Sequence, residues 1–100
     1  MRTIYKYPIE ITDSQTLEIS EDHKFLSVQV QNDKPCIWAL VDTETPESPV
    51  NIHIYGTGHP IPKDLSMTYI GTIQVYDGRG VFHVFMEESK SIPKNRTICR

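Results

Sequence analysis

The sequence lacks the features that mark several large classes of protein. Only 2 of its 100 residues are cysteine, Cys36 and Cys99, which is too few for the disulfide framework of a small secreted domain. No apolar run approaches the roughly 20 residues that cross a bilayer, and charge interrupts the apolar stretch at the N-terminus, unlike in a signal peptide. We therefore expect free thiols in a soluble, intracellular protein with no membrane partner.

Signatures of catalysis and of metal binding are equally scarce. There is no G-x-S-x-G elbow, no G-K-[ST] phosphate loop and no pair of carboxylates that stands out. The 4 histidines lack metal-ligand spacing, although pairing between strands can still bring two of them together. We predict that the protein is not an enzyme and has neither a metal site nor a cofactor. The histidines are His23, His53, His59 and His83.

Basic residues are few and unevenly placed. The formal net charge is −3, and four of the 10 basic residues lie in the last thirteen positions, 88–100, beside a single acidic residue. The other 87 positions hold six basic and twelve acidic residues, a net charge of −6. Because nonspecific binding to duplex nucleic acid requires many phosphate-neutralising Lys and Arg side chains, this distribution argues against such a partner.

Alternating apolar and polar residues recur along the chain, separated by turn-forming residues, and no amphipathic segment is long enough for a good helix. The pattern predicts one all-β domain over residues 1–87, an antiparallel β-sandwich or open barrel of about seven short strands. Residues 88–100 lose this rhythm and are predicted to be a basic, flexible tail. The expected strands are 3–10, 15–19, 24–31, 36–42, 50–56, 67–77 and 81–86.

The alternation also assigns side chains to the faces of strands. The strand around Trp38 is apolar on both faces, so we expect it to be covered on both sides. Tyr55 is expected to face away from the core. Simple alternation places Tyr69 on the same face as Gly71 and opposite Thr72. A glycine inside a strand indicates a bulge or the close approach of another backbone.

The segment 50–62 is the best candidate for a functional site. An alternating strand breaks there at Gly56-Thr57-Gly58 and leads into His59, which is followed by two nearby prolines. Glycine permits positive φ, so successive N–H groups can converge as a nest that holds an anion, with Thr57 and His59 adding side-chain donors. The alternative is a glycine turn that simply ends a strand, and nothing else of a phosphate-binding loop is present.

Aromatic side chains on the sheet faces form a second candidate set. Rings of this kind stack on planar bases, with about 1–3 kcal/mol per base, but they more often belong to the core. Tyr55 is the exception, because it is predicted to share an outward face with His53 and it adjoins Gly56. Arg79 and the basic tail are the obvious sources of positive charge. The aromatic set is Trp38, Tyr55, Tyr69, Tyr76, Phe82 and Phe85.

A series of short motifs runs through roughly residues 4–87. They are I-x-K-Y-P at 4–8, Q-T-L-E at 15–18, L-S-V-Q-V-Q-N at 26–32, W-A-L-V-D at 38–42, G-T-G-H-P at 56–60, Y-I-G-T-I-Q at 69–74 and V-F-H-V-F at 81–85. Together they resemble an uncharacterised family of small all-β proteins encoded by bacteriophages and prophages.

The resemblance implies a phage immune-evasion protein, a sponge that captures a cyclic-nucleotide alarm signal of a CBASS- or Thoeris-type defence system without cleaving it. It would act in the host bacterial cytoplasm, bind a cyclic dinucleotide or related signalling nucleotide, and form a homo-oligomer whose second protomer completes a buried pocket. The alternative is a non-catalytic accessory or virion module that docks onto another protein through the edge strand 3–7 or the tail. The expected ligand-binding residues are Trp38, Tyr55, Gly56, Thr57, Gly58, His59, Tyr69 and Arg79.

Overall fold

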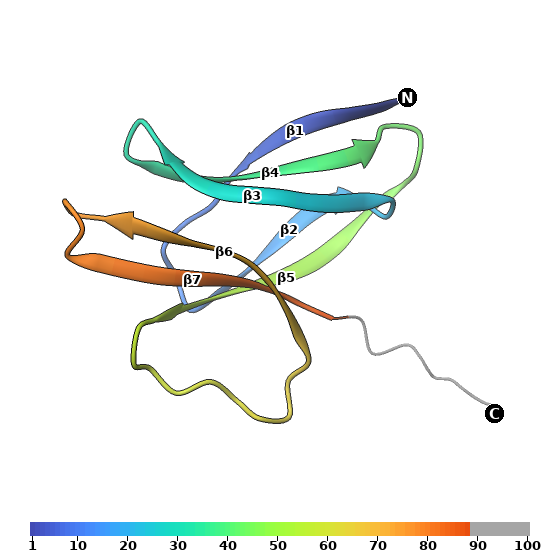
Figure 1. Cartoon of the computed structure of the whole chain (residues 1–100). Coiled ribbons are helices and arrows are strands. Elements are labelled where there is room, and N and C mark those ends of the chain that lie inside the picture. The colour runs from blue at the N-terminus through green and yellow to red at the C-terminus, as the bar shows by residue number, and fades with distance from the viewer. Residues whose placement is uncertain (89–100) are drawn as a thin grey trace.

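The computed structural model describes residues 1–88, which form seven β-strands and no helix. The strands lie in two antiparallel sheets, one in the order β1-β4-β3 and one in the order β2-β5-β7-β6 (Figure 1). This confirms the predicted fold class. The predicted tail, apart from Glu88, lies outside the described residues. The strands are β1 (Arg2–Pro8), β2 (Ser14–Ser20), β3 (His23–Gln31), β4 (Lys34–Asp42), β5 (Glu47–Gly56), β6 (Met67–Val75) and β7 (Gly80–Glu87).

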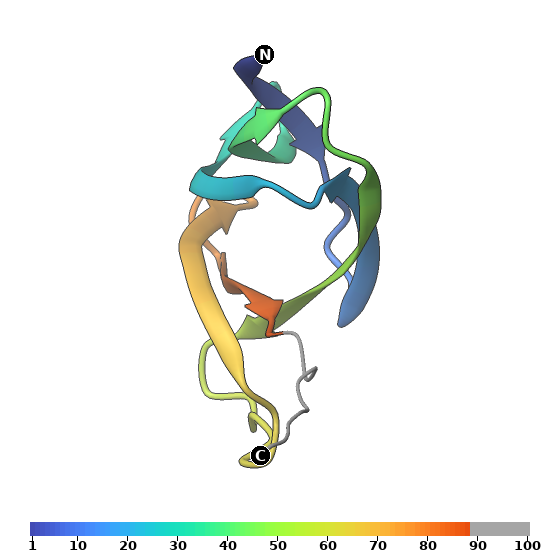
Figure 2. The same ribbon diagram turned by 90° about the vertical axis from the view of Figure 1, so that its right-hand side faces the viewer.

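The two sheets face each other across an apolar core. Alternation within each strand sends one set of aliphatic side chains inward, and Ile37, Ile52 and Val84 are completely buried there. Figure 2 shows that the strands follow one another around a ring, so the sandwich approaches an open barrel. The main core consists of Ile9, Val28, Ile37, Ile52, Ile54, Ile73 and Val84, and a smaller cluster consists of Ile19, Ala39 and Val41.

Gly71 lets the two sheets meet where β3 packs against β6. A Cβ atom on Gly71 would lie 2.7 Å from Cγ1 of Val28, so a side chain at this position would collide with the neighbouring strand. The pairing of β6 with β7 also shifts register between Tyr69 and Gly71, which marks a β-bulge. The predicted bulge is therefore confirmed, and the close neighbour of Gly71 is the side chain of Val28, with the Val28 nitrogen at an ordinary contact distance of 3.7 Å from the same Cβ position.

The same bulge corrects the predicted face of Tyr69. Simple alternation placed Tyr69 opposite Thr72, but the extra residue in the bulge reverses the side on which Tyr69 emerges. Its hydroxyl oxygen lies 2.5 Å from Oγ1 of Thr72. Tyr69 is 56% exposed, so it is available on the surface and is not a core residue.

The strand around Trp38 is covered on one side only, which corrects the expectation of two covered faces. β4 is the central strand of the three-stranded sheet, and Ile37 and Val41 point from it into the core. Trp38 and Leu40 are half-buried on the opposite face. That face has no second layer among residues 1–88, because the described strands form only two sheets.

Candidate functional site

The solvent side of the four-stranded sheet, here called the outer face, has a row of aromatic side chains. The register places Tyr55 of β5 opposite His83 of β7, and Phe85 of β7 between His53 and Tyr69 of the neighbouring strands. The ring centroids of Tyr55 and Phe85 are 5.9 Å apart, and those of Phe85 and Tyr69 are 5.5 Å apart, both edge to face. The row therefore runs across three strands, with Tyr69 as its exposed end.

A chain of hydrogen bonds ties the β5–β6 connection to this face through His83. Nε2 of His83 lies 2.7 Å from Oγ1 of Thr57, and Nδ1 lies 2.9 Å from Oγ1 of Thr72. The histidine of a Ser-His-Asp triad has a carboxylate at the second nitrogen, whereas the partner here is a hydroxyl. The arrangement is therefore suited to holding Thr57 in place.

A second histidine lies at the other end of the aromatic row. Nε2 of His53 is 2.8 Å from Oε1 of Glu87, and both side chains are largely buried. Burial raises the pKa of the nearby Tyr55 phenol, and the negative charges of Glu87 and Asp13 raise it further. Tyr55 therefore presents a flat ring and a neutral hydroxyl at physiological pH.

The sequence Gly56-Thr57-Gly58-His59 forms a tight turn. The amide of His59 donates to the carbonyl of Gly56 at 3.0 Å, and Gly58 has a φ of 89°, the conformation that glycine favours in such turns. The amide of Thr57 donates to the carbonyl of Val81 at 3.3 Å. The amides of Thr57 and His59 are thus used within the protein, which corrects the expectation that they form a main-chain nest for an anion.

Gly56 has a different role, because the imidazole ring of His59 lies against it. A Cβ atom on Gly56 would be 2.9 Å from Cε1 and 3.0 Å from Nδ1 of His59. The φ of Gly56 is not positive, so the lack of a side chain, and not backbone freedom, is what this position requires. Glycine at 56 therefore allows the turn to seat the His59 ring on its own backbone.

His59 stands between two hollows. The first, called the turn hollow, has a volume of about 370 Å³ and is lined by Gly56, Thr57, His59 and Arg79, together with residues 80–82. Nε of Arg79 donates to the carbonyl of Tyr76 at 3.0 Å, which anchors the guanidinium beside the hollow.

The second, called the loop hollow, has a volume of about 610 Å³. It lies under the connection between β5 and β6, which Figure 1 shows as a long loop projecting from the barrel. Its lining residues are Asp13, Ser14, His53, Ile54, Tyr55, His59, Pro60, Pro62 and Leu65. An imidazole and a tyrosine ring thus line the same cavity.

A family model matches residues 1–95, and the family is described as a domain of unknown function, DUF7352. The chain belongs to this family. No curated protein and no solved structure matches the chain. Within residues 1–88 of this DUF7352 domain, no group of three or more His, Cys, Asp or Glu side chains is arranged to hold a metal ion, and no helix is suited to crossing a membrane.

Most of the residues predicted to bind a ligand lie on one side of the DUF7352 domain. Gly56, Thr57, His59 and Arg79 share the turn hollow, Tyr55 shares the loop hollow with His59, and Tyr69 ends the aromatic row. Gly58 is at the exposed tip of the turn, and apart from its chain neighbours no atom of residues 1–88 lies within 4 Å of the position of a Cβ.

Trp38 does not join this group. It lies on the solvent side of the three-stranded sheet, where it lines a separate hollow of about 260 Å³ with Ser27 and Gln29. A single ligand at the turn therefore cannot use Trp38 within the same chain.

Four residues of the site are not among the predicted ligand-binding residues, although His53, His83 and Phe85 were named as wider candidates; they are His53, Thr72, His83 and Phe85. Alternation places the side chains of β7 correctly and indicates that His83 and Phe85 share a face. The pairing of β5 with β7, which sets His83 opposite Tyr55, is a long-range register and has no local signal in the sequence.

Proposed function

We propose that the protein is a non-catalytic binding module that sequesters a small nucleotide, such as a cyclic dinucleotide, beside the turn 56–59. The observation that supports this most strongly is the position of His59. Its imidazole lines both hollows, with Arg79 in one and the ring of Tyr55 in the other. A positively charged group that can bind a phosphate, Arg79, thus lies in the hollow next to the one that contains a ring for a base, Tyr55.

In this proposal the turn hollow takes a phosphate group. A guanidinium is a planar, bidentate partner for phosphate oxygens, and Arg79 lines this hollow with its Nε already oriented by the protein. The hydroxyl of Thr57, held by His83, adds a neutral partner. Side chains replace the main-chain amides that the sequence suggested.

The rings then bind the planar part of the ligand. Tyr55 lines the hollow next to the phosphate position, and the aromatic row leads from it through Phe85 to the exposed Tyr69. Stacking on such rings contributes about 1–3 kcal/mol per base and tolerates different bases. A ligand with two bases fits a surface that has rings at two separated points.

The site is exposed to solvent, and this affects how a bound ligand would be retained. Thr57, His59 and Arg79 are all exposed in one chain, so tight retention requires a cover. We propose that a second protomer provides it, as the resemblance to phage-encoded sponges suggests, and that the ligand is an immune signal in the cytoplasm of an infected bacterium.

A melting experiment on the full-length protein tests the proposal. A panel of cyclic di- and trinucleotides and cyclic ADP-ribose isomers is added, and the melting temperature is recorded. At a ligand concentration 100 times the Kd, stabilisation by about 2.7 kcal/mol corresponds to a rise of about 10 °C or more. Recovery of the intact ligand after heating distinguishes sequestration from cleavage. No shift with any member of the panel would refute the proposal.

Matched variants locate the binding. Arg79→Ala should abolish the shift, whereas Arg2→Ala, which removes an exposed arginine from β1, should leave it unchanged. Tyr69→Ala should weaken the shift, whereas Tyr5→Ala should not alter the affinity. Equal effects of both arginine variants would indicate general charge attraction instead of a site.

A second candidate function is docking onto another protein through β1. This strand lies at the edge of its sheet, and its Ile4 and Tyr5 are 55% and 47% exposed. An edge strand offers main-chain groups to an added strand. Capture of a host or virion protein that Ile4→Pro abolishes and Arg79→Ala preserves would favour this function.

A further inference from the structure

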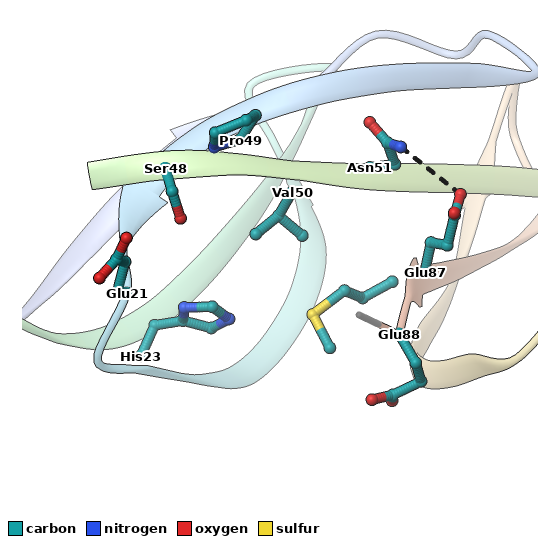
Figure 3. Close-up of a pocket in the computed structure, with 9 residues that line it drawn as sticks. Glu21, His23, Ser48, Pro49, Val50, Asn51, Glu87 and Glu88 are labelled. Carbon is teal, nitrogen blue, oxygen red and sulfur yellow. Dashed lines mark hydrogen bonds between the residues drawn. The ribbon is translucent and has the colours of Figure 1, made fainter. Parts of the chain in front are cut away.

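Another hollow lies at one end of the barrel, away from the turn at 56–59. It has a volume of about 460 Å³ and is called the mouth hollow here. Figure 3 shows that Glu21, in the turn before β3, and His23, the first residue of β3, face Ser48 and Val50 of β5 across it, with Glu88 on the third side. Its lining residues are Glu21, His23, Ser48, Pro49, Val50, Asn51, Met86, Glu87 and Glu88.

The mouth hollow has an apolar floor and a negatively charged rim. Pro49, Val50 and Met86 are apolar, and three carboxylates line the hollow with no Lys or Arg among the lining residues. Glu87 is engaged by His53 and Asn51. Glu21 and Glu88 form no ion pair with any side chain of residues 1–88.

The sequence that follows Glu88 complements this lining. Residues 89–100 contain four basic side chains and no acidic one. Within them Ile92 and Pro93 lie between Lys90 and Lys94, so an apolar pair is flanked by two cations. The match to the DUF7352 family continues to residue 95 and includes this segment.

We propose that the segment 89–94 of the same chain docks in the mouth hollow. The two lysines pair with the carboxylates of Glu21 and Glu88, and Ile92 covers the apolar floor. Glu88 itself lines the hollow, and six residues span up to about 20 Å when extended, so the segment is long enough to cross it. This docking does not depend on the proposed nucleotide site.

The two cysteines provide a direct test on the full chain. Cys36 is buried, with 2% of its surface exposed, so a thiol-reactive spin label is expected to attach selectively to Cys99. If the segment docks, the label should reduce the NMR signals of Val50, Asn51 and Met86. The signals of Asn32, at the far end of β3, should remain.

Two perturbations identify the cause. In about 1 M salt, where the Debye length falls to about 3 Å, the lost signals should return. They should also return in the double variant Glu21→Gln with Glu88→Gln, but not in Glu18→Gln, which changes an exposed carboxylate of β2 outside the hollow.

Three results would overturn the proposal. The first is full retention of the Val50, Asn51 and Met86 signals at low salt. The second is a uniform loss of signal over the whole domain, which would mean that the segment has no preferred position. The third is a loss seen only when spin-labelled and isotope-labelled chains are mixed, which would identify a second copy as the occupant.

Discussion

Substitution of Gly71 by alanine should destabilise the protein because it separates the two sheets. The new methyl group would lie 2.7 Å from Cγ1 of Val28, where ordinary contacts are 3.4–4 Å, so the strands must move apart by roughly 1 Å. Val28 is 5% exposed and belongs to the main core. Overpacking of this kind costs about 1–3 kcal/mol. In a domain of this size each 1 kcal/mol lowers Tm by about 4–8 °C.

The assay is thermal or urea unfolding of the wild type and three variants. Gly71→Ala should lower Tm by at least about 4 °C. Val28→Ala alone should also destabilise because it empties part of the core. The double variant should be less destabilised than the sum of the two, since Val28→Ala removes the methyl that the new group meets. A Tm for Gly71→Ala equal to that of the wild type would refute the close approach of β3 and β6.

Three other changes have distinct expected outcomes. Gly56→Ala should change Tm by only a few degrees relative to the wild type, because the exposed His59 ring can rotate away from the new methyl group. It should nevertheless weaken nucleotide binding, since it displaces that ring. Unchanged binding would contradict the role of His59. Tyr55→Phe should flatten the fall in stability above pH 10, because burial and Glu87 raise the folded-state pKa and the folded protein therefore loses stability as the phenol ionises. Asp42→Asn should lower stability near pH 7 and progressively less below about pH 4, because a backbone hydrogen bond lowers the folded-state pKa of this carboxyl. Urea unfolding of the Tyr55 and Asp42 variants across the pH range measures both effects.

The strand pattern could be predicted from the sequence because each strand has a local period of two. Ile52 and Ile54 are buried and Asn51 is exposed, as alternation along β5 requires. Tyr69 shows where this reasoning fails, because a bulge adds one residue and reverses every face beyond it. The glycine at 71 signalled a bulge but not its consequence for Tyr69.

The candidate site could be predicted only in outline. The glycines at 56 and 58 marked the turn, and His59 and Arg79 do line one hollow beside it. The order of strands in the sheets was not predictable, and it is this order that places Trp38 in the other sheet. The hydrogen bonds of the turn amides likewise depend on β7, which supplies the carbonyl of Val81.

An NMR titration tests whether a nucleotide binds beside the turn 56–59. The isotope-labelled full-length protein is titrated with the cyclic dinucleotide that most raises its Tm. If it binds there, the chemical shifts of Arg79 Nε, of the His59 imidazole and of the Tyr55 ring should change, and those of Trp38 should not. Shifts centred on Trp38, or none at His59 and Arg79, would contradict it.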